Sequence, residues 1–170
     1  MRRSAILDFY RHDAPDDRGR TLDEVRAQNA IELERVHDYI QWLFPLPEPS
    51  GANPAAPILT ADDIAAFHAD ESLRRDLLAS FAVMLEFYGF RVAHGTTRIE
   101  RLIDADIRIA EWFRPGNHNF LRLTRIMRSL AVLGLPEYAH ALLAQLEQLY
   151  REQPAVVGEQ TMGFWRRAGR

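Results

Sequence analysis

The sequence of 170 residues contains no cysteine and no lysine, and all 21 of its basic residues are arginine. Because cysteine is absent, disulfide bonds, thiolate catalysis and cysteine-ligated zinc or iron–sulfur sites are excluded. Because lysine is absent, the chain has no side chain for a Schiff base, for a phosphate-loop lysine or for a lysine general base.

Long apolar runs and catalytic motifs are absent as well. No stretch approaches the roughly 18 apolar residues that a membrane-spanning helix needs, and the apolar stretch that ends at Asp8 is too short for a secretory signal. No phosphate-loop, nucleophile-elbow or HExxH motif occurs. With 47% hydrophobic and 26% charged residues, the composition is typical of a globular protein. We therefore expect a soluble, cytoplasmic protein without a cofactor.

The apolar residues recur at the three- and four-residue spacing of helices, and no alternating pattern of strand length occurs. The sequence therefore predicts an all-α fold: a single compact helical domain of about five main helices plus short helices, with a proline-rich extended strap. We assign residues 1–153 to this domain and residues 154–170 to a short C-terminal tail with one helical turn or more. Helices are expected at 22–44 with an interruption at Asn29, and at 61–68, 71–88, 97–113, 117–133 and 136–151.

The ends of these helices carry capping residues. Thr21 and Glu24 have the spacing of a capping box. Gly89 stands where a left-handed C-cap belongs after the helix at 71–88. On the helix expected at 97–113, four residues should face inward: Ile99, Leu102, Ile103 and Ala110.

An unusual cluster lies between residues 37 and 60, where the apolar residues 39–44 run directly into prolines at 45, 47 and 49. Proline cannot continue a helix, so an extended strap follows. In one interpretation, Trp42 fills the core at a buried helix end while His37 and Gln41 hydrogen-bond the strap. In a second, aromatic walls hold a peptide whose backbone pairs with His37 and Gln41. A third interpretation is a contact between copies of the chain.

A second polar group gathers at residues 117–128. Arg122 and Arg125 are helical neighbours, and His118 lies one turn before Arg122. The helix start at Asn117 offers free amides and a positive dipole end, which suit a carboxylate or phosphate anion. Alternatively, Arg122 and Arg125 pair with acids of the preceding helix, which are Glu100, Asp104, Asp106 and Glu111. Nucleic acid is not expected, because the net charge is −3.

The spacing Glu-x-x-His, which di-iron bundles use, occurs at Glu34–His37 and at Glu137–His140. Such a site also needs two inward glutamates, for which Glu86 and Glu111 are the candidates. The alternative to a binding module is therefore a small helical enzyme or a di-iron-like metal protein that uses His37, His118 and buried acids.

Five segments resemble the opioid growth factor receptor conserved region. The most specific are two long blocks, and three less specific segments lie at matching places along the chain. The segments are HDYIQWLFPLPEPS (37–50), NHNFLRLTRIMRSLAVLGL (117–135), MLEFYGF (84–90), PILT (57–60) and DFYRHDAPDDRGRTLDEV (8–25).

This resemblance implies a receptor-like, non-enzymatic module that binds a peptide or protein, with an enkephalin-like peptide as the ligand associated with the family in animals. The arginine-only composition and the missing C-terminal repeats indicate a bacterial homologue. We expect the ends of both long blocks to border one cleft, with His37 and Arg122 on its rim. The expected ligand-binding residues are His37, Gln41, Trp42, Asn117, His118, Asn119, Arg122 and Arg125.

Overall fold

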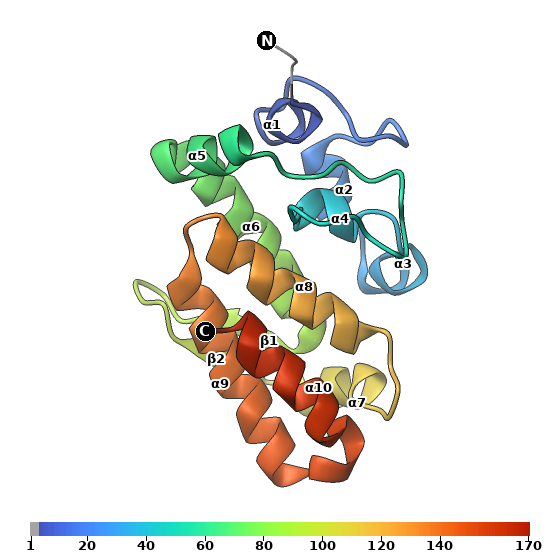
Figure 1. The fold of residues 1–170 in the computed structure, drawn as a ribbon. Helices are drawn as coiled ribbons and strands as arrows, with labels where there is room; N and C mark the ends of the chain where they lie inside the picture. Colours follow the sequence, from blue (N-terminus) through green and yellow to red (C-terminus); the bar gives the residue numbers. More distant parts are fainter. Residues whose placement is uncertain (1–3) are drawn as a thin grey trace. The chain divides into compact units, whose positions relative to one another are not determined.

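A computed structural model describes residues 4–170, which contain ten helices and one two-stranded sheet (Figure 1), so the predicted all-α class is confirmed. None of the helices in this range is long and apolar enough to cross a bilayer. The elements are α1 (Ala5–Tyr10), α2 (Leu22–Arg26), α3 (Ala30–Arg35), α4 (Ile40–Leu43), α5 (Ala61–Ala69), α6 (Glu71–Tyr88), β1 (Phe90–Val92), β2 (Ile99–Arg101), α7 (Ala105–Trp112), α8 (Asn119–Val132), α9 (Pro136–Glu152) and α10 (Pro154–Ala168).

The chain divides into two compact units, and the boundary between Ser80 and Phe81 lies within α6. We call them unit 1, described from residue 4 to residue 80, and unit 2, residues 81–170. Each unit is described by itself.

Capping boxes explain why the first half of unit 1 breaks into short helices. The Thr21 hydroxyl accepts a hydrogen bond from the Glu24 amide, and the Glu24 carboxylate accepts one from the Thr21 amide. These hydrogen bonds hold the pKa of Glu24 below its ordinary value. Asn29 and Glu32 form a second box at the start of α3, so the predicted interruption at Asn29 is confirmed. The structure adds a further break between α3 and α4, at residues 36–39.

The apolar cluster at residues 39–44 is buried, as the helix-end interpretation predicts. Tyr39 is fully buried and its hydroxyl donates to the Leu33 carbonyl, while the Tyr10 hydroxyl donates to the Leu43 carbonyl. The two ends of the strap are joined by a hydrogen bond: the amide of Leu59 donates to the carbonyl of Leu46, shortly after α4, at 3.1 Å. Burial raises the pKa of Tyr10 well above its ordinary value, so this hydroxyl stays a donor.

A buried carboxylate organises the loop between α1 and α2. The Asp16 side chain has no exposed surface, and it accepts hydrogen bonds from the backbone amides of Arg18 and Arg20 at 2.9 Å. The Arg20 guanidinium binds the other Asp16 oxygen at 2.7 Å and reaches Asp38 at 2.8 Å. This loop therefore ties residue 16 to the segment that precedes α4.

We predict that Asp16→Asn lowers the free energy of unfolding by about 1–3 kcal/mol, because the buried carboxylate that pairs with Arg20 loses its charge. Urea denaturation followed by circular dichroism measures the change. Asp13→Asn is the control, since Asp13 is exposed and its carboxylate makes no hydrogen bond or ion pair within residues 4–170. Equal stability of the two variants would contradict the proposed role of Asp16.

The junction after α6 differs from the sequence-based expectation. The predicted helix at 97–113 is wrong in its first half: residues 99–101 form β2, which pairs antiparallel with β1, and α7 begins only at Ala105. Ile99 is buried as expected, but Ile103 and Ala110 are exposed and Leu102 is half-buried. The residues of α7 that face inward are Ala105, Ile109 and Trp112.

Three helices, α8, α9 and α10, pack against one another in unit 2 (Figure 1). Trp165 in α10 is fully buried, contacts Phe120 edge-on at 5.3 Å, and donates its indole N–H to the Phe120 carbonyl. Residues 154–168 thus form a helix that packs in unit 2, beyond the short tail that the sequence suggested. Gly158, with φ of 75°, kinks this helix.

Gly89 ends α6 in the left-handed conformation, with φ of 92°, as predicted. A Cβ atom at this position would lie 3.2 Å from the backbone of Ala105 and 3.3 Å from the Arg108 side chain. The turn therefore needs glycine both for its φ and for its close approach to α7.

We predict that Gly89→Ala destabilises the protein more than Gly116→Ala does. Gly116 also has a positive φ, 72°, but a Cβ there would meet nothing within 4 Å. Gly116→Ala should therefore show only the backbone strain, roughly 1–2 kcal/mol, whereas Gly89→Ala adds the contact with rigid backbone. Thermal and urea unfolding of both variants test this, and an equal loss at both positions would remove the steric argument.

Candidate functional site

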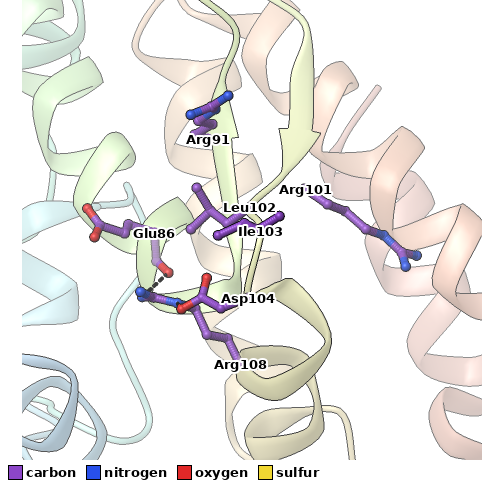
Figure 2. A pocket seen from close by; sticks show the side chains of 7 residues that line it. All are labelled: Glu86, Arg91, Arg101, Leu102, Ile103, Asp104 and Arg108. Carbon is purple, nitrogen blue, oxygen red and sulfur yellow. Dashed lines mark hydrogen bonds and ion pairs between the residues drawn. The ribbon is translucent and has the colours of Figure 1, made fainter.

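The candidate site is a cavity of about 640 Å³ in unit 2 (Figure 2). Its wall combines three arginines, two acids and two aliphatic side chains. The lining residues are Glu86, Arg91, Arg101, Leu102, Ile103, Asp104 and Arg108. Volumes of this order are typical of small-ligand pockets.

Four elements deliver these side chains. Glu86 lies in the last turn of α6, Arg91 is the middle residue of β1, and Arg101 ends β2. Arg108, on α7, donates to the Asp104 carboxylate at 2.8 Å and to the Glu86 carbonyl at 2.9 Å (Figure 2). Through these two bonds, Arg108 satisfies a carbonyl at the C-terminal end of α6 and fixes one wall of the cavity.

The other two arginines are held at the surface by carboxylates. Arg91 and Glu100 pair at 2.8 Å across the sheet, and Arg101 approaches Glu152 at 3.1 Å and Asp106 at 3.8 Å. The Arg91 side chain is 64% exposed, so this pair is screened by water and contributes little to folding. A ligand carboxylate can therefore compete for Arg91 at small cost.

A second hollow of about 350 Å³ lies between α7 and the end of α9. Its lining combines four charged or polar side chains with four apolar ones. The lining residues are Arg101, Asp106, Ile109, Ala110, Phe113, Leu149, Glu152 and Gln153. Arg101 lines both spaces and so stands between them.

The cavity could not be anticipated from the sequence, because Arg91 and Arg101, ten residues apart, come to line one space only through the register of the hairpin, in which Arg91 opposes Glu100. A signal was present: Gly89 and Gly95 bracket Phe90–Val92 and mark turns that would end a short strand.

The predicted ligand-binding residues of unit 1 differ in their exposure to solvent. His37 is exposed between α3 and α4, whereas Gln41 and Trp42 on α4 are buried. The Trp42 indole donates to Asp17 at 3.0 Å and its ring contacts Phe9 at 5.2 Å. The Gln41 amide donates to the Ser50 hydroxyl at 3.3 Å, while its carbonyl oxygen is buried and accepts no hydrogen bond from residues 4–170.

The predicted unit 2 residues form a connected group at the start of α8. The Asn117 side chain accepts a hydrogen bond from the backbone amide of Asn119 at 2.8 Å. The buried side-chain oxygen of Asn119 accepts hydrogen bonds from the Tyr88 hydroxyl at 3.2 Å and from the Arg122 guanidinium at 3.3 Å. Arg122 is only 5% exposed. His118 and Arg125 are half-buried.

The alternative in which Arg122 and Arg125 pair with acids of the preceding segment gains no support from those acids. Those acids bind other arginines: Glu100 pairs with Arg91 and Arg98, Asp104 with Arg108, Asp106 with Arg101, and Glu111 with Arg114. Local pairing within the hairpin and α7 satisfies these carboxylates. Because the two units are described separately, a cleft shared by His37 and Arg122 stays a prediction.

We predict that Asn119→Ala lowers the free energy of unfolding by about 1–3 kcal/mol, because it leaves the Tyr88 hydroxyl and Arg122 without this acceptor. Differential scanning calorimetry measures the change, with the exposed Gln160→Ala on α10 as control. Unchanged stability, together with weaker peptide binding, would instead assign Asn119 to the ligand.

The di-iron alternative receives no support from the arrangement of its side chains. Among residues 4–170, no group of three or more histidine or acidic side chains is arranged to hold a metal ion. The proposed inward ligands Glu86, Glu111, Glu137 and His140 are all exposed at the surface, whereas a di-iron centre requires carboxylates that project into a bundle.

Comparison with known proteins identifies the family. Residues 3–169 match the opioid growth factor receptor (OGFr) conserved region. The chain belongs to this family. No solved structure matches it.

The OGFr-region relatives are longer than this chain. Rat opioid growth factor receptor is 37% identical over 142 residues, which are 81% of this chain and 24% of the relative. Rat opioid growth factor receptor-like protein 1 is 40% identical over 142 residues, covering 81% of this chain and 30% of the relative. Human opioid growth factor receptor is 38% identical over 112 residues, which are 65% of this chain and 16% of the relative. The chain thus spans less than a third of each relative, and the prediction of a bacterial homologue gains no support from these mammalian matches.

Proposed function

We propose that this OGFr-region chain is a non-enzymatic, receptor-like module in the cytoplasm that recognises a peptide or protein partner. The observation that carries the proposal is family membership over residues 3–169, since relatives matched over this region bear the name receptor. The cavity in unit 2 supplies a place where such a partner can bind.

The chemistry of the cavity suits a short peptide that combines an apolar side chain with a carboxylate. Leu102 and Ile103 provide apolar surface at its centre (Figure 2). Arg91 can exchange its surface partner Glu100 for a ligand carboxylate, which arginine binds with a two-pronged geometry. Glu86 can accept a hydrogen bond from a peptide amide or amine.

The binding residues predicted from the sequence offer a second location for the ligand. The buried Gln41 carbonyl oxygen needs a donor, which water or a ligand amide can supply. Binding there by His37, Gln41 and Trp42, or by an anion at the Asn117 helix start, remains a prediction. No specific observation favours the enzyme alternative.

We predict that Arg91→Ala weakens peptide binding about fivefold, equivalent to about 1 kcal/mol for an exposed ion pair. Arg98→Ala should leave binding unchanged. The two arginines form a matched pair, since both contact Glu100 but only Arg91 lines the cavity.

Isothermal titration calorimetry of peptides selected from a library of acidic–apolar sequences, with an enkephalin pentapeptide included, provides the measurement. Equal effects of Arg91→Ala and Arg98→Ala would move the site away from the cavity. A folded protein that binds no peptide in the library would count against the function itself.

A further inference from the structure

Five charged side chains line the 640 Å³ cavity, and they differ in how they are paired. Arg108 binds Asp104 at 2.8 Å within the wall. Arg91 and Arg101 bind carboxylates that lie outside the lining, at 2.8 Å and 3.1 Å. The carboxylate of Glu86, by contrast, makes no hydrogen bond or ion pair with any residue from 4 to 170. When the three ion pairs are set aside, the charge left in the wall is the negative charge of Glu86.

Arg108 lies against Glu86 without neutralising its side chain. The guanidinium donates to the backbone carbonyl of Glu86 at 2.9 Å and to the Asp104 carboxylate at 2.8 Å, as Figure 2 shows. The Glu86 side chain is exposed, so a cation from solution can reach its carboxylate without breaking a bond within the protein. A ligand carboxylate, in contrast, must first displace Glu100 from Arg91.

The apolar part of the wall projects into solvent. Ile103 is 107% exposed, although isoleucine is usually buried. It lines the cavity together with Leu102, which is half-buried, and both residues belong to the turn that connects β2 to α7. An apolar ligand group that covers Ile103 removes apolar surface of both partners from water, which favours binding.

We propose that the cavity binds the free amino terminus of a peptide whose first residue has an apolar side chain. The ammonium group pairs with Glu86, and the first side chain covers Ile103 and Leu102. An amino-terminal residue suits this wall because its ammonium group and its side chain leave the same Cα atom. The ammonium group of a lysine side chain lies instead at the end of a flexible four-carbon stem, with no apolar branch beside it.

This site rests on the proposed peptide-binding function and specifies which end of the peptide enters the cavity. A carboxylate further along the peptide can still exchange with Glu100 at Arg91, so the two contacts are compatible. Because Glu86 is exposed, its ion pair with the ammonium group should raise the affinity by about threefold to fivefold. The gain should decrease in high salt, which screens exposed charges.

The probe for the first experiment is L-leucinamide, which has an amino group and an apolar side chain but no carboxylate. It is titrated into the whole, isotope-labelled chain at about pH 6.5, where an α-amino group is protonated, and binding is followed by NMR. We expect saturable shifts of the Leu102 and Ile103 signals at millimolar concentrations. N-acetyl-L-leucinamide, in which the amino group is blocked, should bind about threefold to fivefold more weakly. Nα-acetyl-L-lysinamide, which carries its ammonium group on the side chain, should also bind more weakly.

Variants assign these effects to named side chains. Glu86→Gln should abolish the difference between L-leucinamide and its acetylated form, because glutamine keeps the size of the side chain but not its charge. Glu137→Gln is the matched control, since Glu137 is an exposed helical glutamate of unit 2 that does not line the cavity. Ile103→Ala should weaken both probes. Ile107→Ala should weaken neither, because Ile107 is 73% exposed but lies outside the cavity lining.

Unchanged affinity after acetylation, a difference that persists in Glu86→Gln, or equally tight binding of Nα-acetyl-L-lysinamide would each overturn the proposal. Circular dichroism confirms that the variants are folded. The peptide library separates this site from the proposed function. Peptides that bind equally well with free and with acetylated amino termini would leave the function in place and remove the amino-terminal site. Binding of L-leucinamide through Glu86, with no library peptide bound, would support the site and count against the function.

Discussion

The arrangement of unit 2 around its cavity depends on the close approach of Gly89 to α7. The Gly89 carbonyl accepts from the Leu102 amide at 3.0 Å, and the preceding carbonyl, that of Tyr88, accepts from the buried Trp112 indole at 3.1 Å. A Cβ atom on residue 89 would lie 3.2 Å from the backbone of Ala105, closer than an ordinary van der Waals contact. The end of α6, the hairpin and α7 are thus joined at one point.

Because the elements meet there, their charged residues meet as well. Glu86 lies one turn before the junction on α6, Arg91 lies two residues after it, and Arg108 reaches back to the Glu86 carbonyl. The arginine thereby adds a second donor to a carbonyl that already accepts from the Gly89 amide at 3.1 Å. Two hydrogen bonds hold Arg108 on one side of the cavity, whereas the Arg91–Glu100 ion pair on the other side is exposed. This difference suits a site that keeps its shape while it exchanges one surface pair for a ligand.

Local signals were sufficient to predict the helices whose ends are capped within the sequence. Thr21 and Gly89 cap helices and Asn29 interrupts one as expected, because a cap is a contact between residues two to four positions apart. The segment from residue 97 to residue 104 was misassigned, since strands of three residues are too short to show alternation and Ile99, Leu102 and Ile103 mimic helical spacing. The cavity could not be predicted for the same reason: strand register brings Arg91 and Arg101 to one space, and no local pattern specifies that register.

The position of Arg101 explains how one short helix can present two different surfaces. Asp104 and Arg108 point to the cavity side of α7, whereas Asp106 and Ala110 lie on the side of the hollow, as the 3.6-residue period requires. Arg101 fills the space between them and is anchored to α9 by Glu152. A group bound in the cavity therefore meets different side chains from a group bound in the hollow, apart from Arg101 itself. Energetic coupling between the two surfaces would pass through Arg101 or through movement of α7, because these are the parts that both spaces share.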